Sequence, residues 1–214
     1  MIIDIDLRGK TVVIFGGGTV GERKATKFLT AGANVIVASR DFTEKLRRLS
    51  SRKKLELIHV DLDAAPGKIR TLSSSADVVV VATNRPEINR RIGDEAKKRR
   101  IPVNVADNPN LGDFTMPDTS TIGEFRIAVS TGGKSPAMSR FLRRRVEELI
   151  RDEDILMVRL QSYARKLVRA RITDQQSRKK VLDIIMQDKK IRQMLKKRKL
   201  QDAKGLTRHI IGGY

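Results

Sequence analysis

Short apolar runs alternate with amphipathic stretches along residues 1–112 of this 214-residue chain. Such runs predict buried strands, and the stretches between them have the spacing of helices. The alternation predicts an α/β fold with a doubly wound parallel sheet. The expected strands are Thr11–Phe15, Asn34–Ala38, Leu55–His59, Val78–Ala82 and Pro102–Val105. The expected helices are Val20–Ala31, Thr43–Leu49 and Glu87–Arg99.

The pattern changes beyond residue 112. Phe125–Val129 alternates as a strand, and Thr115–Thr121 fits a partner strand or an extended segment. From Pro136 onward apolar residues recur near helical spacing. We therefore expect three parts, which are a nucleotide-binding domain, a small β dimerisation segment and a basic helical domain, over residues 1–112, 113–140 and 141–214.

Turn-forming residues mark the expected ends of elements. Gly32 should close the first helix. Pro66-Gly67 and Ser73–Ser75 predict loops, and Asp174 and Gly205 predict helix boundaries in the C-terminal part.

The first expected strand ends in Gly16-Gly-Gly-Thr-Val-Gly21, directly before a helix. Gly16 permits a tight turn, Gly18 lets the backbone approach a pyrophosphate, and Gly21 lets helix and strand pack closely. A phosphate binds well at the N-terminus of such a helix. The alternative is a glycine-rich turn without a ligand, but this strand–turn–helix context favours a Rossmann-type NAD(P) site.

Composition narrows the class of protein. The chain has no Cys, two His and 4% aromatic residues. The absence of Cys excludes disulfides and thiolate metal sites and fits a reducing compartment. No apolar run approaches the length of a membrane span, and the N-terminus lacks the basic region of a signal peptide. We expect a soluble cytoplasmic protein.

The chain is strongly basic, with a formal net charge of +20. The excess is densest over residues 141–214, where 21 Lys and Arg face nine Asp and Glu. A positive field of this size concentrates nucleic acid, a membrane surface or a polycarboxylate. Charge alone does not choose among them.

Polar residues follow two further strands at the predicted nucleotide crevice. The second strand ends in Ser39, Arg40 and Asp41, in place of the acid that usually binds the ribose of NAD. Arg40 suits the 2′-phosphate of NADP equally well, or is a solvated loop charge. Thr83 and Asn84 follow the fourth strand at the same edge.

Two more segments have residues suited to binding or catalysis. Asp107 ends the fifth strand, where a nicotinamide ring should lie, although an Asx-turn residue is the simpler local reading. Ser130–Pro136 links a strand to a helix and contains Lys134, so it could bind a carboxylate or phosphate. An ordinary helix cap is the alternative.

Five segments match one known family in order and at matching intervals over residues 1–150. They are Gly16–Lys24, Ala82–Asn84, Val103–Asp107, Asp113–Pro117 and Ser130–Pro136. On these segments the chain resembles the precorrin-2 dehydrogenase/sirohydrochlorin ferrochelatase family, the dehydrogenase module of siroheme synthase. The helical remainder is a looser match.

The resemblance implies NAD-dependent oxidation of precorrin-2 to sirohydrochlorin by a homodimer, with Fe2+ insertion in some members. It gives the catalytic role to Asp107, and cofactor contacts to Thr19 and Val20 and to Arg40 and Asp41. A polycarboxylate tetrapyrrole also suits a basic chain. The candidate substrate-binding residues are Ser130, Thr131, Gly132, Lys134 and Ser135.

Departures from the family favour a dehydrogenase without iron insertion. Many relatives have Cys where this chain has Gly112, and His59 and His209 are its only histidines. We therefore expect no metal-ligating residues. One rival reading is a nucleotide-sensing regulator whose basic tail, Lys189–Lys204, binds nucleic acid. Another is a Rossmann oxidoreductase with a different small substrate, and NADP stays open as the cofactor.

Overall fold

The computed structural model describes residues 2–214, which form two compact units that divide after Met116. The first unit has the predicted α/β architecture, and the second has a strand pair followed by helices. The finer division of the chain at residues 112 and 140 stays a prediction.

The first unit, described from residue 2 onward, is built on a five-stranded parallel sheet in the order β3-β2-β1-β4-β5. β1 and β4 are apolar along their whole interior because both faces of the sheet are covered. The strand order reverses at β1 and β4, where doubly wound sheets form their ligand crevice. The strands are β1 (Thr11–Phe15), β2 (Asn34–Ser39), β3 (Glu56–His59), β4 (Val78–Val81) and β5 (Val103–Val105).

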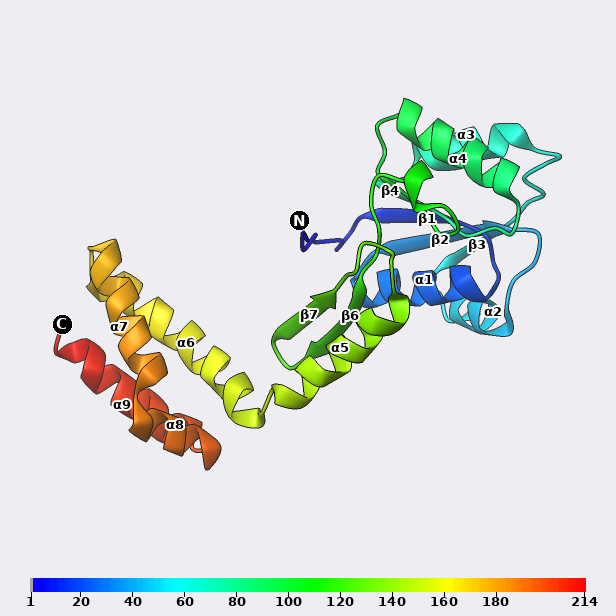
Figure 1. Ribbon diagram of the computed structural model, residues 1–214. Coiled ribbons are helices and arrows are strands. Elements are labelled where there is room, and N and C mark those ends of the chain that lie inside the picture. Colours follow the sequence, from blue (N-terminus) through cyan, green and yellow to red (C-terminus); the bar gives the residue numbers. More distant parts are fainter. Residues whose placement is uncertain (1) are drawn as a thin grey trace. The chain divides into compact units, whose positions relative to one another are not determined.

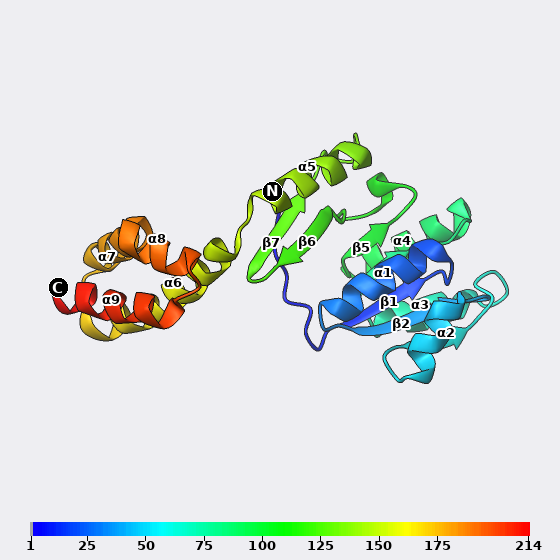
Figure 2. The ribbon, with the colours of Figure 1, turned by 90° about the horizontal axis from the view of Figure 1, so that it is seen from below.

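Helices cover both faces of this sheet (Figure 1). α1 (Thr19–Thr30) and α2 (Glu44–Ser51) pack on one face, and α3 (Pro66–Ser74) and α4 (Pro86–Lys98) pack on the other. Figure 2, seen from below, has α1 and α2 in front of the sheet. Alternate strand residues enter the two cores, so Val13 lies under α3 and α4 while Ile14 lies under α1.

The sequence missed α3. The expectation of loops at Pro66-Gly67 and Ser73–Ser75 is wrong, because these residues begin and end this helix. Proline suits the first position of a helix, where its missing N–H is not needed. Ile69 and Leu72 are buried and pack the short helix on the sheet. Tertiary packing therefore outweighs the local turn signals.

A buried lysine connects α1 to β5, the edge strand of the parallel sheet. Lys24 is 9% exposed, and its Nζ donates to Asn104 Oδ1 at 2.6 Å. Asn104 in turn donates from Nδ2 to the Phe114 carbonyl oxygen at 2.8 Å. Burial, together with the nearby charges of Arg23 and Lys27, lowers the pKa of Lys24 to about 8.

This depressed pKa makes stability depend on pH. Between about pH 8 and 10.5 the unfolded chain holds a proton on Lys24 that the folded chain has released, so the free energy of unfolding rises with pH. We expect a rise of about 3 kcal/mol from this group. Urea unfolding at several pH values should show the rise in the wild type and in the exposed-site control Lys68→Met. Its persistence in Lys24→Met would assign it to another group.

The second unit begins with an antiparallel strand pair, β6 (Asp118–Ile122) and β7 (Phe125–Val129). α5 (Pro136–Leu149) packs against both strands and is fastened by Arg143, whose Nε donates to Asp118 Oδ2 at 2.6 Å. The expected partner strand and the helix from Pro136 are thus confirmed.

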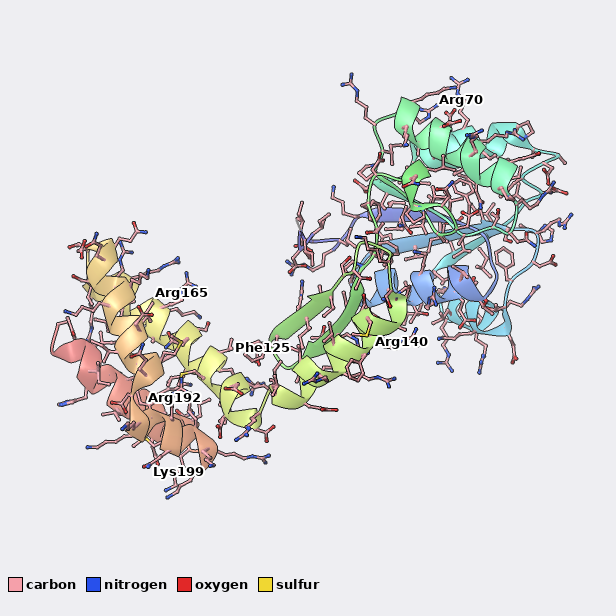
Figure 3. All side chains as sticks on the ribbon, viewed as in Figure 1. Arg70, Phe125, Arg140, Arg165, Arg192 and Lys199 are labelled. Carbon is pink, nitrogen blue, oxygen red and sulfur yellow. The ribbon has the colours of Figure 1, made fainter. Side chains whose placement is uncertain are left out.

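The rest of the second unit is helical, with its own apolar core. Its helices are α6 (Asp152–Arg171), α7 (Gln175–Gln187), α8 (Lys189–Lys196) and α9 (Leu200–Gly212). The core includes Leu160, Val181, Ile185, Leu195 and Ile211. Exposed charged side chains include Arg165 on α6, Arg192 on α8 and Lys199 at the N-cap of α9 (Figure 3).

The two helix boundaries expected in this region differ in outcome. Asp174 is the N-cap of α7 and accepts from the Ser177 N–H at 2.6 Å, as predicted. The boundary at Gly205 is wrong, because this glycine lies inside α9. Residues on either side of it, Ala203 and Thr207, are buried, so packing holds the helix through the glycine.

Over residues 2–214, the structure contains no helix that is both long and apolar enough to cross a membrane. The cytoplasmic location stays a prediction.

Candidate active site

The glycine turn after β1 has the backbone that its sequence predicts. Gly16 has φ +116°, and a Cβ there would lie 2.4 Å from the Ala82 carbonyl oxygen. A Cβ at Gly21 would lie 1.9 Å from the Gly16 carbonyl oxygen, so the helix meets the turn in direct backbone contact. Gly18 is the N-cap of α1, and no protein atom would lie within 4 Å of a Cβ there. The turn is therefore closed toward the protein and open at the helix N-terminus, where a phosphate binds well.

A cavity of about 600 Å³ opens at the carboxyl ends of β1, β2 and β4. Gly21 lies beneath it and does not line it. The other cofactor candidates all line it, namely Gly16, Gly18, Thr19, Val20, Ser39, Arg40, Asp41, Thr83 and Asn84. The structure thus brings together three strand ends that the sequence had marked separately.

Ion pairs at the cavity were not predicted from the sequence. Arg40 Nη1 lies 3.6 Å from Asp61 Oδ2, and Arg85 forms an ion pair with Asp63. All four residues line the cavity. Both acids belong to the loop between β3 and α3. The sequence did not predict α3, so it did not predict the course of this loop either. Asp61 Oδ1 also accepts from the Asp63 N–H at 3.0 Å, which holds the loop in a tight turn.

Asp107 is exposed just beyond the end of β5. One side chain connects it by hydrogen bonds to the cavity residue Thr83. That side chain is Asn89 of α4, which is fully buried. Its Nδ2 donates to Asp107 Oδ2 at 2.9 Å and to the Thr83 carbonyl oxygen at 3.1 Å. The Asx-turn reading of Asp107 is not supported, because the structure instead has Asn108 accepting from the Asn110 N–H.

The Ser130–Pro136 segment lies in the second unit, between β7 and α5. Ser135 is the N-cap of α5 and accepts from the Met138 N–H at 3.3 Å, while Thr131 Oγ1 accepts from the Ser135 N–H at 2.8 Å. Gly132 and Gly133 have φ of +62° and +83°, with open space beside both. The segment is an ordered cap whose glycines and Lys134 are exposed, and its binding role stays a prediction.

A metal-binding cluster of three or more His, Cys, Asp or Glu side chains is absent from residues 2–214. At Gly112, where the family resemblance suggests Cys, a Cβ would lie 2.9 Å from the Val103 carbonyl oxygen. A cysteine would therefore require this backbone to move.

Two known families match parts of this chain. Residues 3–118 match the family described as "Putative NAD(P)-binding". Residues 126–149 match the family described as "Sirohaem biosynthesis protein central". The first match includes the glycine turn and Asp107, and the second begins on β7 and ends with α5.

Three relatives illustrate the similarity. The precorrin-2 dehydrogenase of Methanosarcina barkeri is 37% identical over 179 residues, which is 83% of this chain and 79% of that protein. The siroheme synthase of Nitrosospira multiformis is 34% identical over 86% of this chain and 39% of its own length. The solved structure of SirC, a precorrin-2 dehydrogenase, superposes with a TM-score of 0.72 and 21% identity over the whole of both chains. That structure has the same fold, and the sequence matches show that this chain belongs to the precorrin-2 dehydrogenase family.

Proposed function

We propose that this chain oxidises precorrin-2 to sirohydrochlorin with NAD+ as the hydride acceptor, a step in siroheme biosynthesis. The observation that carries the proposal is an exposed carboxylate, Asp107, joined through Asn89 to the rim of a glycine-lined dinucleotide cavity. A dinucleotide bound in this cavity would accept the hydride that leaves the tetrapyrrole. Family membership and the separate strand ends that form this cavity favour an enzyme over the regulator with a nucleic-acid-binding tail.

The cofactor would lie along the carboxyl edge of the sheet. The N–H groups of the first turn of α1, beginning at Thr19, would bind the pyrophosphate next to Gly18. Ser39, Arg40 and Asp41 at the end of β2 would contact the adenosine ribose. Thr83 and Asn84 at the end of β4 would then lie toward the nicotinamide ring, on the side of β5 and Asp107.

The reaction removes one hydride and one proton from the tetrapyrrole. The hydride goes to NAD+, and Asp107 accepts the proton as a general base. The products are sirohydrochlorin, NADH and a proton that Asp107 releases to water. The protein contributes positioning, because the conjugated macrocycle and the dinucleotide carry the redox chemistry.

The acidic substrate suits the basic surface. Its acetate and propionate arms would pair with Lys and Arg side chains, among them Lys134 beside the exposed glycines of the β7–α5 segment. Ser130, Thr131, Gly132 and Ser135 complete the candidate substrate site. The net charge of +20 would also speed the encounter with a polyanion, an effect that salt should weaken.

The test is turnover. Purified protein, precorrin-2 and NAD+ are mixed, and the absorbance of NADH and of sirohydrochlorin is followed together. The proposal predicts equal molar amounts of the two products, formed only with enzyme. Parallel reactions with NADP+ measure which dinucleotide the protein prefers, a choice on which Arg40 should act. Tetrapyrrole oxidation that does not depend on either dinucleotide would overturn the proposal.

A homodimer is proposed from the outer face of α5. Met138, Leu142, Val146 and Leu149 recur at helical spacing and are exposed, Leu149 by 74%. α5 packs on β6 and β7 and leaves this apolar stripe exposed, so a second copy of the chain could cover it. The expected dimerisation segment, residues 113–140, would then contribute β6 and β7 next to the same helix.

Substitution of the stripe should separate the protomers. In Leu142→Glu/Leu149→Glu a charge enters the middle and the end of the apolar face, and burying it is costly. We expect sedimentation equilibrium to give the dimer mass for the wild type and the monomer mass for this variant. Arg144→Glu adds the same charge elsewhere on exposed α5 and should stay dimeric. A monomeric wild type, or a dimeric double variant, would contradict the assignment.

Iron insertion is expected to be absent or slow. Its acceleration would need groups that bind Fe2+ and remove pyrrole protons, and the histidine inventory is thin. With sirohydrochlorin and Fe2+ under anaerobic conditions, we expect siroheme to form at the rate of the reaction without protein. A rate that grows in proportion to enzyme concentration would show that the chain is also a chelatase.

A further inference from the structure

A buried amide connects the two strand ends at the candidate active site. Asn89 lies one turn into α4 and has no exposed surface. Burying an amide costs free energy unless its polar atoms are hydrogen bonded. Here the partners are Thr83 after β4 and Asp107 after β5. The polar atoms of Asn89 therefore bind residues of the candidate site, although the side chain is buried beside the apolar core under α4.

The partners fix the orientation of the Asn89 amide. The Thr83 carbonyl oxygen and the Asp107 carboxylate can only accept, so the nitrogen must face both of them. Oδ1 faces Thr83 Oγ1 at 2.5 Å and accepts from it. Both amide protons and the amide oxygen are then in use, and rotation of the side chain would break every one of these bonds.

Thr83 is itself held by the start of α4. The Arg85 N–H donates to Thr83 Oγ1 at 3.1 Å, and Arg85 is the N-cap that precedes Pro86 at the first helical position. Proline restricts the backbone there, so the helix begins in a defined direction. A continuous series of hydrogen bonds thus runs from the start of α4 through Thr83 and Asn89 to Asp107.

We infer that Asn89 is a positioning residue for precorrin-2 oxidation, which aims Asp107 and keeps it able to accept a proton. The inference rests on the proposed function of Asp107. Asn89 occupies Oδ2, and Oδ1 has no hydrogen-bond partner within residues 2–214, so Oδ1 is the atom left to take the substrate proton. Since Thr83 also lines the cavity, the same hydrogen bonds set the distance between the base and the cofactor.

The inference is tested with Asn89→Ala, which removes the donor, and Asn89→Asp, which keeps the shape of the side chain and replaces the donor by a second carboxyl group. Arg90→Ala, at an exposed position of the same helix, is the control and should behave as wild type. For each protein we would measure the Kd for NAD+, the KM and kcat for precorrin-2, and the dependence of kcat/KM on pH.

We expect kcat of Asn89→Ala to fall about 100-fold while KM and the NAD+ Kd stay near wild type. In Asn89→Asp two carboxyl groups share one site, so the acidic limb of the profile should move up by about one pH unit or more. If Asn89→Ala does not fold, the profile of Asn89→Asp decides alone. An unchanged kcat in folded Asn89→Ala, or an unmoved profile in Asn89→Asp, overturns the inference. A wild type without turnover overturns the proposed function instead.

Discussion

Asp107→Ala should lower kcat for precorrin-2 oxidation by about 1,000-fold, in the range that loss of a general base produces. In the proposed mechanism Asp107 takes the tetrapyrrole proton as the hydride leaves, and Asp107 is the exposed carboxylate that the Asn89 contact joins to the cavity rim. The NAD+ Kd should stay near the wild-type value, because Asp107 does not line the dinucleotide cavity. Stopped-flow measurement of NADH formation gives kcat, and calorimetric titration gives the Kd.

Two variants make this result specific. Asp107→Asn keeps the size of the side chain and removes its basicity, so it should be as inactive as Asp107→Ala. Asp94→Ala removes an exposed carboxylate from neighbouring α4 and should retain full activity. Turnover by Asp107→Asn near the wild-type rate would show that the carboxylate is not the base.

Gly21→Ala should have the second large effect, this time on folding. The new Cβ would lie 1.9 Å from the Gly16 carbonyl oxygen, a distance that no rotation of a side chain can relieve. The helix must move away from the turn, at a cost of about 3 kcal/mol. Thermal unfolding should show a lower midpoint, and NAD+ binding should be lost, because the turn and the helix N-terminus no longer meet correctly.

Gly18→Ala is the matched control, since it adds the same methyl group three residues earlier. Gly18 has φ −79° and open space on its Cβ side, so the fold should be unaffected. If the pyrophosphate lies there, the methyl group should weaken NAD+ binding more than tenfold, about 1.4 kcal/mol or more. Wild-type NAD+ affinity in Gly18→Ala would place the phosphates elsewhere, and a fully stable Gly21→Ala would contradict the close packing.

The sheet could be predicted from the sequence because its strands are buried on both faces. β1 and β4 are uninterrupted apolar runs, and each predicted strand lies within a residue of the observed one at either end. Helices with long amphipathic patterns, such as α1 and α4, were predicted equally closely.

The elements that the sequence missed are short or depend on tertiary contacts. α3 has proline and glycine at its start and serines at its end, and its helical state depends on burying Ile69 and Leu72. Gly205 looked like a helix end, but contacts of its neighbours across the helical core keep α9 intact. Local propensity is a weak guide wherever such packing decides.

The sequence predicted those parts of the candidate site in which distinctive residues directly follow a strand. Glycines, Arg40 and Asp107 each follow a strand, and parallel strands bring their carboxyl ends to one edge. Asn89 was not predicted, because a polar residue within a charged amphipathic helix looks like a solvated position. Its position in the helix did indicate burial, because Asn89 lies on the same side of α4 as Ile88 and Ile92.

A crystal structure of the wild-type protein with NAD+ bound would show directly where the dinucleotide lies. We expect the pyrophosphate on the N–H groups at the start of α1, beside Gly18, and the nicotinamide ring at the carboxyl ends of β4 and β5, with its C4 atom facing the Asp107 side. A nicotinamide bound at the β3 end of the sheet, or a dinucleotide outside the glycine-lined cavity, would contradict it.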